Sequence, residues 1–290
     1  MSDVTQPAVQ GFRAALSAWA LREGRTVRFV DQGPLRHRDL LADGARDLAD
    51  LKVDILFSVS TPATRAAVDA TAQHGTPVVF ALVSDPVGAG FAQSLRAPGG
   101  RVTGVQAGDA SSEEDPHRLE LLLLAAPGTK RVCVLYDPDD PLSVASWKAA
   151  HQAADSFGVT VVPCGVASQE DVSTLLAGVA QNVDALYVTR SLLLESLGML
   201  LEGALKARLP LCVSRPEVVP RGAFMGFGAD LRASGEAAAR QAAQIAGGVK
   251  PGVLPIEKPP TLFVINLKTA TSIGVRPPEN ILNLADTLVR

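Results

Sequence analysis

The feature that most constrains the fold is a regular alternation of short apolar runs with amphipathic segments along the 290 residues. Several apolar runs are continuous, which is typical of parallel strands covered on both faces. The amphipathic segments between them indicate helices, so the pattern predicts an α/β fold with right-handed crossovers. The expected strands are Thr26–Val30, Asp54–Val59, Pro77–Val83, Arg131–Tyr136, Val159–Val162, Asp184–Thr189, Leu209–Val213, Ala223–Gly228 and Thr261–Asn266. The expected helices are Pro7–Glu23, Leu40–Leu51, Pro62–His74, Pro116–Ala126, Pro141–Phe157, Gln169–Gln181, Ser191–Ala207 and Arg232–Gly247.

The alternation falls into two sets, which predicts two lobes. The first set runs to about Thr103–Gly104, and the second runs from near Pro116 to Gly228 after a turn-rich stretch, RAPGGRVTG. Because no Ser/Gly-rich linker separates the sets, we expect lobes joined by short crossing segments. The tail Lys258–Arg290 adds one strand, a short helix and, after Pro277–Pro278, a final helix.

The beginning of the chain departs from this pattern. A doubly wound lobe normally opens with a central strand, whereas this sequence starts with a polar decapeptide and the helix Pro7–Glu23. We therefore expect the first strand of lobe one to be missing. The same decapeptide, MSDVTQPAVQ, has neither the basic nor the apolar region of an export signal. The chain is expected to be either cytoplasmic or a mature or trimmed form.

The charge balance excludes several kinds of partner. The 27 Lys and Arg residues against 30 Asp and Glu residues give a net charge of −3. This balance argues against a general nucleic-acid surface and against a polybasic membrane contact. No apolar run approaches the roughly 18 residues that a membrane span needs.

The sequence also lacks the motifs of the main enzyme classes. It has no GxGxxG after a strand, no GxxxxGK[ST], no HExxH and no GxSxG. Its three cysteines are odd in number and far apart, so no disulfide and no metal or redox pair is expected. Cys133 and Cys212 are expected to be buried strand residues. The sequence predicts no catalysis, no metal and no cofactor.

The stretch ILFSVSTPATRAA is the most informative for function. An apolar strand ends at Val59, and Ser60 or Thr61 can cap the helix that Pro62 opens. The turn places free backbone N–H groups and two hydroxyls at the carboxyl edge of a sheet. Such an edge favours a carboxylate or a phosphate.

Further expected strands end in a similar way, with small hydroxyls, carboxylates or arginines. Ligands of open α/β sheets bind outside the carboxyl ends of the strands, so two facing sheets would line one cleft with these residues. The arginines can clamp a carboxylate by paired hydrogen bonds, and the aspartates can accept from an amine. Taken singly, each residue is better explained as a helix cap or a surface ion pair, and it is their convergence at five strand ends that favours a cleft. The residues are Ser84 and Asp85, Tyr136 and Asp137, Thr189 and Arg190, and Ser214 and Arg215, together with Phe227, which can stack on a ligand.

Four stretches together resemble the ABC-transporter substrate-binding proteins of the type 1 periplasmic fold. They are STPATRAA, VVFALVSDPVGAGFAQSLRAPGGRVTG, RLELLLLAAPGTKRVCVLYDPDDP and FVINLKTATSIGVRPPENILNLAD. The branch that they resemble includes tryptophan and tyrosine binders. The resemblance implies two Rossmann-like lobes with parallel sheets, joined by three crossing segments, with a small ligand between them. It places residues 1–105 and 230–254 in lobe one, and residues 106–229 and 255–290 in lobe two.

The resemblance also implies roles for individual positions. Ser60 and Thr61 fall on the first-lobe ligand loop, and Ser84 and Asp85 on the second. Tyr136, Asp137, Thr189 and Phe227 fall on second-lobe or hinge positions. The sequence departs from the family pattern at Arg190–Ser191–Leu192, where relatives have Asp-Asn, and at Asp137 and Asp140, where they usually have Asn. These departures prevent the ligand identity from being carried over.

The sequence therefore predicts a non-catalytic binding protein for a small polar ligand, an amino acid or related carboxylate. Binding would proceed by hinge closure, and the partner would be an ABC permease. The resemblance implies a periplasmic or other extracytoplasmic location. One alternative is a cytoplasmic ligand-sensing domain of the same fold. A weaker alternative is a phosphate-ester or nucleotide enzyme that uses the Ser60–Pro62 turn as an anion cradle.

Overall fold

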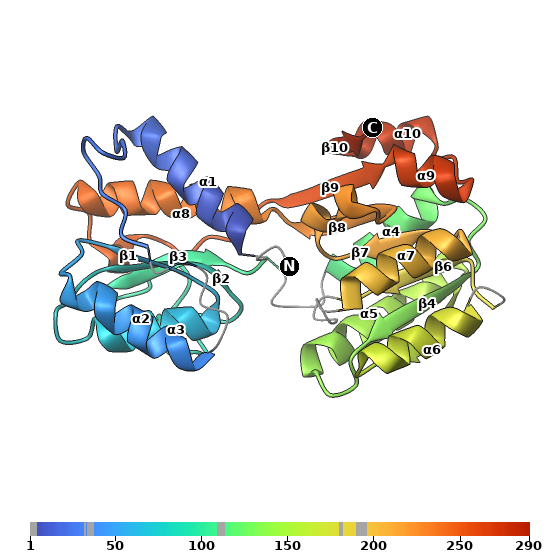
Figure 1. The fold of residues 1–290 in the computed structure, drawn as a ribbon, viewed down its shortest axis with the longest axis horizontal. Helices are drawn as coiled ribbons and strands as arrows, with labels where there is room; N and C mark the ends of the chain where they lie inside the picture. The colour runs from blue at the N-terminus through green and yellow to red at the C-terminus, as the bar shows by residue number, and fades with distance from the viewer. Residues whose placement is uncertain (1–4, 32, 34–37, 109–113, 180–181, 190–195) are drawn as a thin grey trace. The chain divides into compact units, whose positions relative to one another are not determined.

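The chain folds into two compact units with an α/β architecture (Figure 1). The computed structural model describes residues 5–31, 33, 38–108, 114–179, 182–189 and 196–290. Unit 1 comprises Met1–Ala110 and Asp230–Pro260, and unit 2 comprises Ser111–Ala229 and Thr261–Arg290. The chain thus passes from one unit to the other three times. The predicted α/β fold of two lobes with three crossing segments is confirmed.

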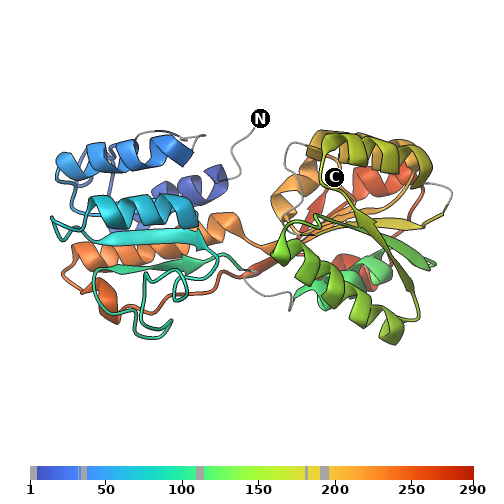
Figure 2. The same cartoon turned by 90° about the horizontal axis from the view of Figure 1, so that it is seen from below.

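Unit 1 is a three-stranded parallel sheet between two layers of helices (Figures 1 and 2). The sheet order is β1-β2-β3, with β1 at Leu56–Val59, β2 at Val78–Val83 and β3 at Val102–Gln106. Its central strand is almost wholly buried, which explains the continuous apolar run. One helical layer holds α1 (Gln6–Leu16) and α8 (Leu231–Ala246), and the other holds α2 (Arg38–Asp50) and α3 (Thr61–Ala70).

Two glycines let α1 and α8 pack backbone to backbone. A Cβ added at Gly235 would overlap the carbonyl oxygen of Ala8, and one added at Gly11 would overlap that of Arg232. No larger residue fits at either position without moving a helix. This contact fixes the helical layer that covers β2 and β3.

Unit 2 is a seven-stranded sheet with an apolar cluster on each face. The order is β10-β9-β8-β7-β6-β4-β5, and every pair is parallel except β8 with β9. The strands are β4 (Arg131–Tyr136), β5 (Thr160–Gly165), β6 (Ala185–Val188), β7 (Leu211–Val213), β8 (Met225–Ala229), β9 (Thr261–Asn266) and β10 (Thr287–Val289). The helices are α4 (Glu114–Ala125), α5 (Pro141–Phe157), α6 (Gln169–Val179), α7 (Leu197–Ala207), α9 (Leu267–Ile273) and α10 (Glu279–Leu284).

Short 3-10 turns complete the described elements at Ser17–Trp19, Pro216–Arg221 and Pro251–Val253. No described helix combines the length and the apolar character needed to cross a membrane.

Two sequence predictions of elements are wrong. Thr26–Val30 forms no strand but only an isolated bridge between Glu23 and Val27, because Thr26 and its neighbours fold into a tight turn. The stretch predicted as a turn-rich connection, RAPGGRVTG, ends within β3, whose five residues are all buried beside β2. The helix expected after Pro277–Pro278 is present as α10, and the strand β10 that follows it and pairs with β9 was not predicted. Among the described residues, no strand of the unit 1 sheet precedes β1.

The prediction of no disulfide is also wrong. Cys133 and Cys164 form a disulfide between the neighbouring strands β4 and β5, with their Cα atoms 6.0 Å apart. They are 31 residues apart in the sequence, but the strand register brings Cys133 opposite Val162, two residues before Cys164. Cys212 is a buried free thiol in β7, as predicted.

Candidate functional site

The carboxyl ends of β1 and β2 in unit 1 form one connected edge. Thr61 begins α3, and its hydroxyl accepts a hydrogen bond from the backbone N–H of Ser84 at 3.4 Å. Ser60 donates its N–H to the carbonyl of Ala81 at 3.0 Å. The structure therefore brings together Ser60, Thr61 and Ser84, as the sequence predicted for two neighbouring strand ends.

Backbone strain marks the same edge. Ser60 has φ 91° and ψ 156°, and Leu82, two residues before Ser84, has φ 61°. Non-glycine residues rarely hold a positive φ, and such strained positions cluster at binding and catalytic sites. The Ser60 hydroxyl makes no capping hydrogen bond to α3, so the positive end of this helix is not satisfied by its own N-cap side chain.

Asp85 lies beside this edge but serves its own loop. Its carboxylate accepts from the N–H of Gly88 at 2.8 Å, and a Cβ at Gly88 would overlap the same carboxylate. The side chain is exposed. Its described contact is therefore structural.

In unit 2 the ends of β4 and β6 are joined by a chain of hydrogen bonds. Ser143 of α5 accepts from the N–H of Asp137 at 2.8 Å, and its hydroxyl lies 2.6 Å from that of Thr189. Thr189 is 1% exposed, so its hydroxyl is occupied inside the protein. Asp137 turns its own loop by accepting from Asp139 N–H at 2.9 Å. Both residues thus shape the loops of this edge.

An aromatic stack lies at the end of β4. The ring of Tyr136 stacks on Trp147 of α5 at 5.1 Å between centroids, and Trp147 stacks on His151 at 5.8 Å. Tyr136 is half-buried, which leaves part of its surface accessible. The stack supplies a flat apolar surface beside the polar strand ends.

The remaining predicted residues follow β7 and lie in β8. Ser214 and Arg215 are half-buried and precede the 3-10 turn Pro216–Arg221. A Cβ at Gly228 of β8 would overlap the Ser214 carbonyl oxygen, so the two strand ends are in close contact. Arg190 lies outside the described residues.

Sequence reasoning missed a buried polar network under Phe227. Arg118 of α4 donates to the Phe227 carbonyl at 2.7 Å, to Asp115 Oδ1 at 2.7 Å and to the Tyr187 hydroxyl at 2.9 Å. Tyr187 also donates to Asp115 Oδ1. The residues Arg118, Asp115 and Tyr187 are fully buried. The available signal in the sequence was the spacing of three residues between Asp115 and Arg118.

Burial in this region shifts two acidic groups. Desolvation raises the pKa of Tyr187 well above its ordinary value, although the positive charge of Arg118 opposes the shift. Desolvation also raises the pKa of Cys212 to about 12. Both groups therefore stay protonated and neutral near pH 7.

Phe227 itself is half-buried, and its ring meets His117 edge-on with 5.0 Å between centroids. The backbone carbonyl of Phe227 accepts from Arg118, which holds this residue in place near the end of β8 in unit 2. As for metals, no group of three or more His, Cys, Asp or Glu side chains in the described ranges can hold an ion.

Taken together, the two edges offer hydroxyls, helix N–H groups, arginine and aromatic surface. These groups can bind an anion and stack on an apolar ring by non-covalent contacts.

Comparison with known proteins finds a match along almost the whole chain. The family model of ABC transporter substrate binding proteins matches residues 2–289. A tyrosine-binding protein from Clostridioides difficile (strain R20291) is 27% identical over 271 residues, which is 93% of this chain and 77% of the relative.

Solved structures show the same fold. A ligand-free, open substrate binding protein with adhesive properties from Clostridium difficile has a TM-score of 0.78 and 25% identity, over 98% of this chain and 95% of its own. An ABC domain from Streptococcus pneumonia in complex with L-Trp has a TM-score of 0.78 and 22% identity, over 100% and 97% of the two chains. The fold likeness therefore extends over both units.

Proposed function

Because the chain belongs to the family of ABC transporter substrate binding proteins, we propose that it binds a free amino acid or a closely related carboxylate for an ABC permease. The substrate-binding role follows from the family, and the similar tyrosine-binding protein and L-Trp complex support an amino acid as the ligand. The family and these relatives are binding proteins rather than enzymes. The proposal accordingly contains no chemical step.

The connected edge of unit 1 carries the proposal. Ser60 and Thr61 lie at the N-terminal end of α3, where backbone N–H groups and the helix dipole favour an anion. Ser84 extends the same edge through its hydrogen bond to Thr61. We assign the carboxylate of the ligand to this edge.

Unit 2 would supply the rest of the contacts. The accessible part of Tyr136 and the ring of Phe227 suit an apolar or aromatic side chain. The guanidinium groups of Arg190 and Arg215 remain proposed partners for negative charge, and Ser214 a proposed hydrogen-bond partner. Asp85, Asp137 and Thr189 would act by shaping the loops that present these groups. A ligand that contacts groups of both units would favour the conformation in which both are engaged.

We further propose an extracytoplasmic location. Members of this family serve transporters, and the disulfide between Cys133 and Cys164 is of a kind that persists in oxidising compartments and is rare in the cytosol.

Titration calorimetry tests the proposed ligand. L-tyrosine, L-tryptophan and L-leucine are compared with tyramine, which keeps the ring and amine of tyrosine but lacks the carboxylate. We expect saturable binding of at least one amino acid. If that amino acid is tyrosine, tyramine should bind at least about tenfold more weakly, because the edge at Ser60 loses its anion. At about 100 times its Kd, the bound amino acid should add about 2.7 kcal/mol to stability.

Thr61→Ala should weaken that binding about tenfold, whereas Thr61→Ser keeps the hydroxyl and should bind nearly as well. Thr174→Ala, at an exposed position of α6, is the control and should change nothing. If all variants bind the amino acid with equal affinity, the ligand carboxylate does not bind at this edge. Failure of every amino acid and small carboxylate to bind would overturn the proposed function.

A further inference from the structure

Two residues of unit 1 hold a strained backbone that no helix end explains. Five residues other than glycine have a positive φ in the described part of the chain. Three of the five lie in turns that end helices, where left-handed backbone is common. These three are Ala20, Lys52 and Arg208. The other two, Ser60 and Leu82, lie at the carboxyl ends of β1 and β2, and strain at such places points to a binding role.

Leu82 is the extra residue of a bulge in the central strand β2. Ala81 lies opposite Val105 of β3. Val83, two residues further along β2, lies opposite the very next residue of β3. The bulge leaves Leu82 opposite no residue of either neighbouring strand. Bulges of this kind redirect side chains beside functional sites.

The bulge also takes Leu82 out of the apolar interior. Side chains of a strand alternate between the two faces of a sheet, and Val78 and Phe80 belong to one apolar cluster. Regular alternation would place Leu82 next in this row. The structure gives that place to Val83, which is fully buried in the same cluster. Leu82 is half-buried and belongs to none of the apolar clusters that the described residues form, so packing in the core does not explain its strain.

Polar groups of the proposed carboxylate site lie on both sides of Leu82 along the chain. Before it, the carbonyl of Ala81 accepts from the Ser60 N–H at 3.0 Å. After it, the Ser84 N–H donates to the Thr61 hydroxyl at 3.4 Å. Leu82 therefore places one apolar side chain within an otherwise polar edge.

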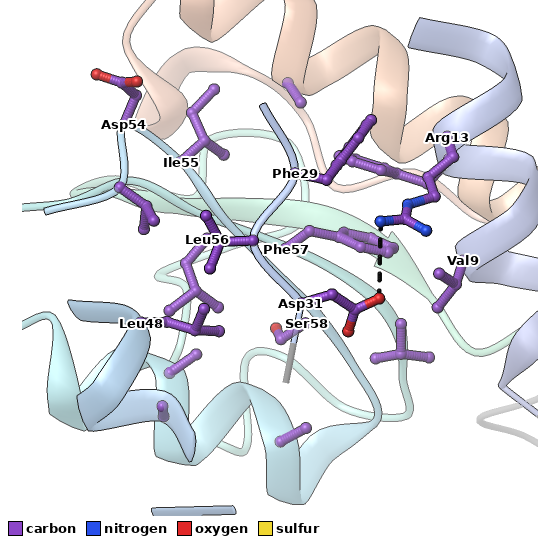
Figure 3. A pocket seen from close by; sticks show the side chains of 18 of the residues that line it. Val9, Arg13, Phe29, Asp31, Leu48, Asp54, Ile55, Leu56, Phe57 and Ser58 are labelled. Atoms are coloured by element: carbon purple, nitrogen blue, oxygen red, sulfur yellow. Dashed lines mark ion pairs between the residues drawn. The ribbon is translucent and has the colours of Figure 1, made fainter. Parts of the chain in front are cut away.

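The neighbouring strand end is held in its own strained conformation by α3. Thr64, which is fully buried, donates its hydroxyl to the Ser60 carbonyl at 2.8 Å. The same hydroxyl lies 2.9 Å from that of Ser58 in β1, which is labelled in Figure 3. These bonds fix the turn at Ser60, so the protein itself holds the polar groups beside Leu82 in place.

We propose that Leu82 is a specificity-determining residue, whose side chain contacts the apolar side chain of the bound amino acid. The inference rests on the proposed function and adds a contact from unit 1 to it. Because the polar groups of the edge are assigned to the ligand carboxylate, an apolar group among them meets the part of the ligand next to that carboxylate. Leucine there favours an amino acid with a large apolar side chain, since their contact removes apolar surface from water.

Leu82→Asn tests this role with little change in side-chain size. Asparagine tolerates a positive φ better than most residues, so the edge should keep its shape. The two ligands are the tightest binder among L-tyrosine, L-tryptophan and L-leucine, and L-alanine, which keeps the carboxylate and amine but has only a methyl side chain. We expect the Kd of the tight binder to rise about tenfold and that of L-alanine to change less than about twofold. Calorimetry measures the first Kd, and competition against the tight binder measures the second.

Leu82→Gly and Arg208→Gly form a matched pair. They replace residues of similar positive φ, 61° and 56°, by the residue that adopts this conformation without strain. Leu82→Gly should reduce the preference for the tight binder over L-alanine, as Leu82→Asn does, while the midpoint of urea unfolding changes little. Arg208 lies between α7 and β7, at the amino ends of the unit 2 strands, so Arg208→Gly should leave both affinities unchanged.

The outcomes separate this inference from the proposed function. If the parent protein binds an amino acid and the preference is unchanged in Leu82→Asn, this inference alone is overturned. Equal weakening of both ligands would also overturn it, because Leu82 would then shape the edge rather than contact the ligand side chain. If the parent protein binds no amino acid, the proposed function fails and this inference fails with it.

Discussion

The two units bury their sheets by different means. Unit 2 has seven strands, an apolar cluster on each face, a disulfide and a fully buried ion pair. Unit 1 has three strands, a helix pair in backbone contact and a cavity of about 1100 Å³ beside its sheet. Because less apolar surface is buried around an open edge, we expect unit 1 to unfold at the lower urea concentration.

The unfolding of each unit can be followed separately. The two tryptophans lie in different units, Trp19 in unit 1 and Trp147 in unit 2. Trp19→Phe leaves a reporter of unit 2, and Trp147→Phe leaves a reporter of unit 1. Each substitution below is expected to move one transition and leave the other in place.

The largest loss of stability is expected when the buried cation of unit 2, Arg118, is removed. Arg118→Ala leaves Asp115 charged and unpaired in a fully buried position and frees the Phe227 carbonyl. We expect a loss of about 3–5 kcal/mol in the free energy of unfolding of unit 2. Urea titration followed through Trp147 fluorescence measures this loss. We expect the unfolding midpoint of unit 2 to fall close to that of unit 1 or below it.

The matched control removes both charges. Arg118→Met combined with Asp115→Leu should recover much of the loss, because no buried charge remains unpaired. If the double variant is as unstable as Arg118→Ala, the network contributes through shape rather than through charge pairing.

A smaller loss is expected when the cross-link of unit 2 is cut. Cys133→Ala with Cys164→Ala releases the chain across a separation of 31 residues, and should cost about 3.7 kcal/mol by the increased freedom of the unfolded chain. Dithiothreitol should act in the same direction on the parent protein. The unit 1 transition should not move, since all three cysteines belong to unit 2. An unchanged unit 2 transition would show that the bond adds nothing to stability.

The sequence predicted those elements that local chemistry defines. The helix Pro141–Phe157 is confirmed at both ends, because Asp140 caps it through Leu142 N–H and Gly158 ends it in a left-handed conformation. The strand Arg131–Tyr136 is likewise confirmed, since a continuous apolar run between polar turns has few alternatives. The prediction of a strand at Thr26–Val30 was wrong because a high strand propensity alone does not provide a neighbouring strand to pair with.

The sequence predicted less of what depends on register and burial. It placed Ser60, Thr61 and Ser84 at strand ends, and their contact followed from the parallel sheet. The Cys133–Cys164 bond depends on which two strands are neighbours, which no spacing along the chain reveals. The buried Arg118 resembled any surface arginine of an amphipathic helix.

A substitution that destabilises unit 1 should widen the difference in stability between the two units. Gly235→Ala places a methyl group against the Ala8 carbonyl and should push α1 away from α8. We expect a loss of about 1–3 kcal/mol, confined to the Trp19 transition. The control is Gly198→Ala in α7, where an added Cβ meets nothing within 4 Å and helix propensity improves. A Gly235→Ala protein as stable as the parent would mean that the helix contact is not tight.

The smallest expected effect is a loss of about 1 kcal/mol from the stability of unit 2 between pH 9 and 10, which narrows the difference in stability between the two units. The folded-state pKa of Cys212 is raised to about 12 from an ordinary value of 9.0, because burial disfavours the thiolate. A raised pKa means that the folded state keeps its proton while the unfolded state loses it. The resulting stability is complete below pH 9 and declines between pH 9 and 12, by about 1.4 kcal/mol per pH unit. The pKa of Tyr187 is also raised by burial, so this residue lowers the stability of unit 2 in the same direction as the pH rises above 10.

Unit 2 alone should lose stability in this way, because neither tyrosine nor cysteine occurs in unit 1. Urea titrations at pH 8.5, 9.5 and 10 follow the Trp147 transition in the parent and in Cys212→Ala. The variant removes the thiol, so its decline between pH 9 and 10 should be shallower than that of the parent. Identical slopes would show that Cys212 titrates in the folded protein as it does in the unfolded chain.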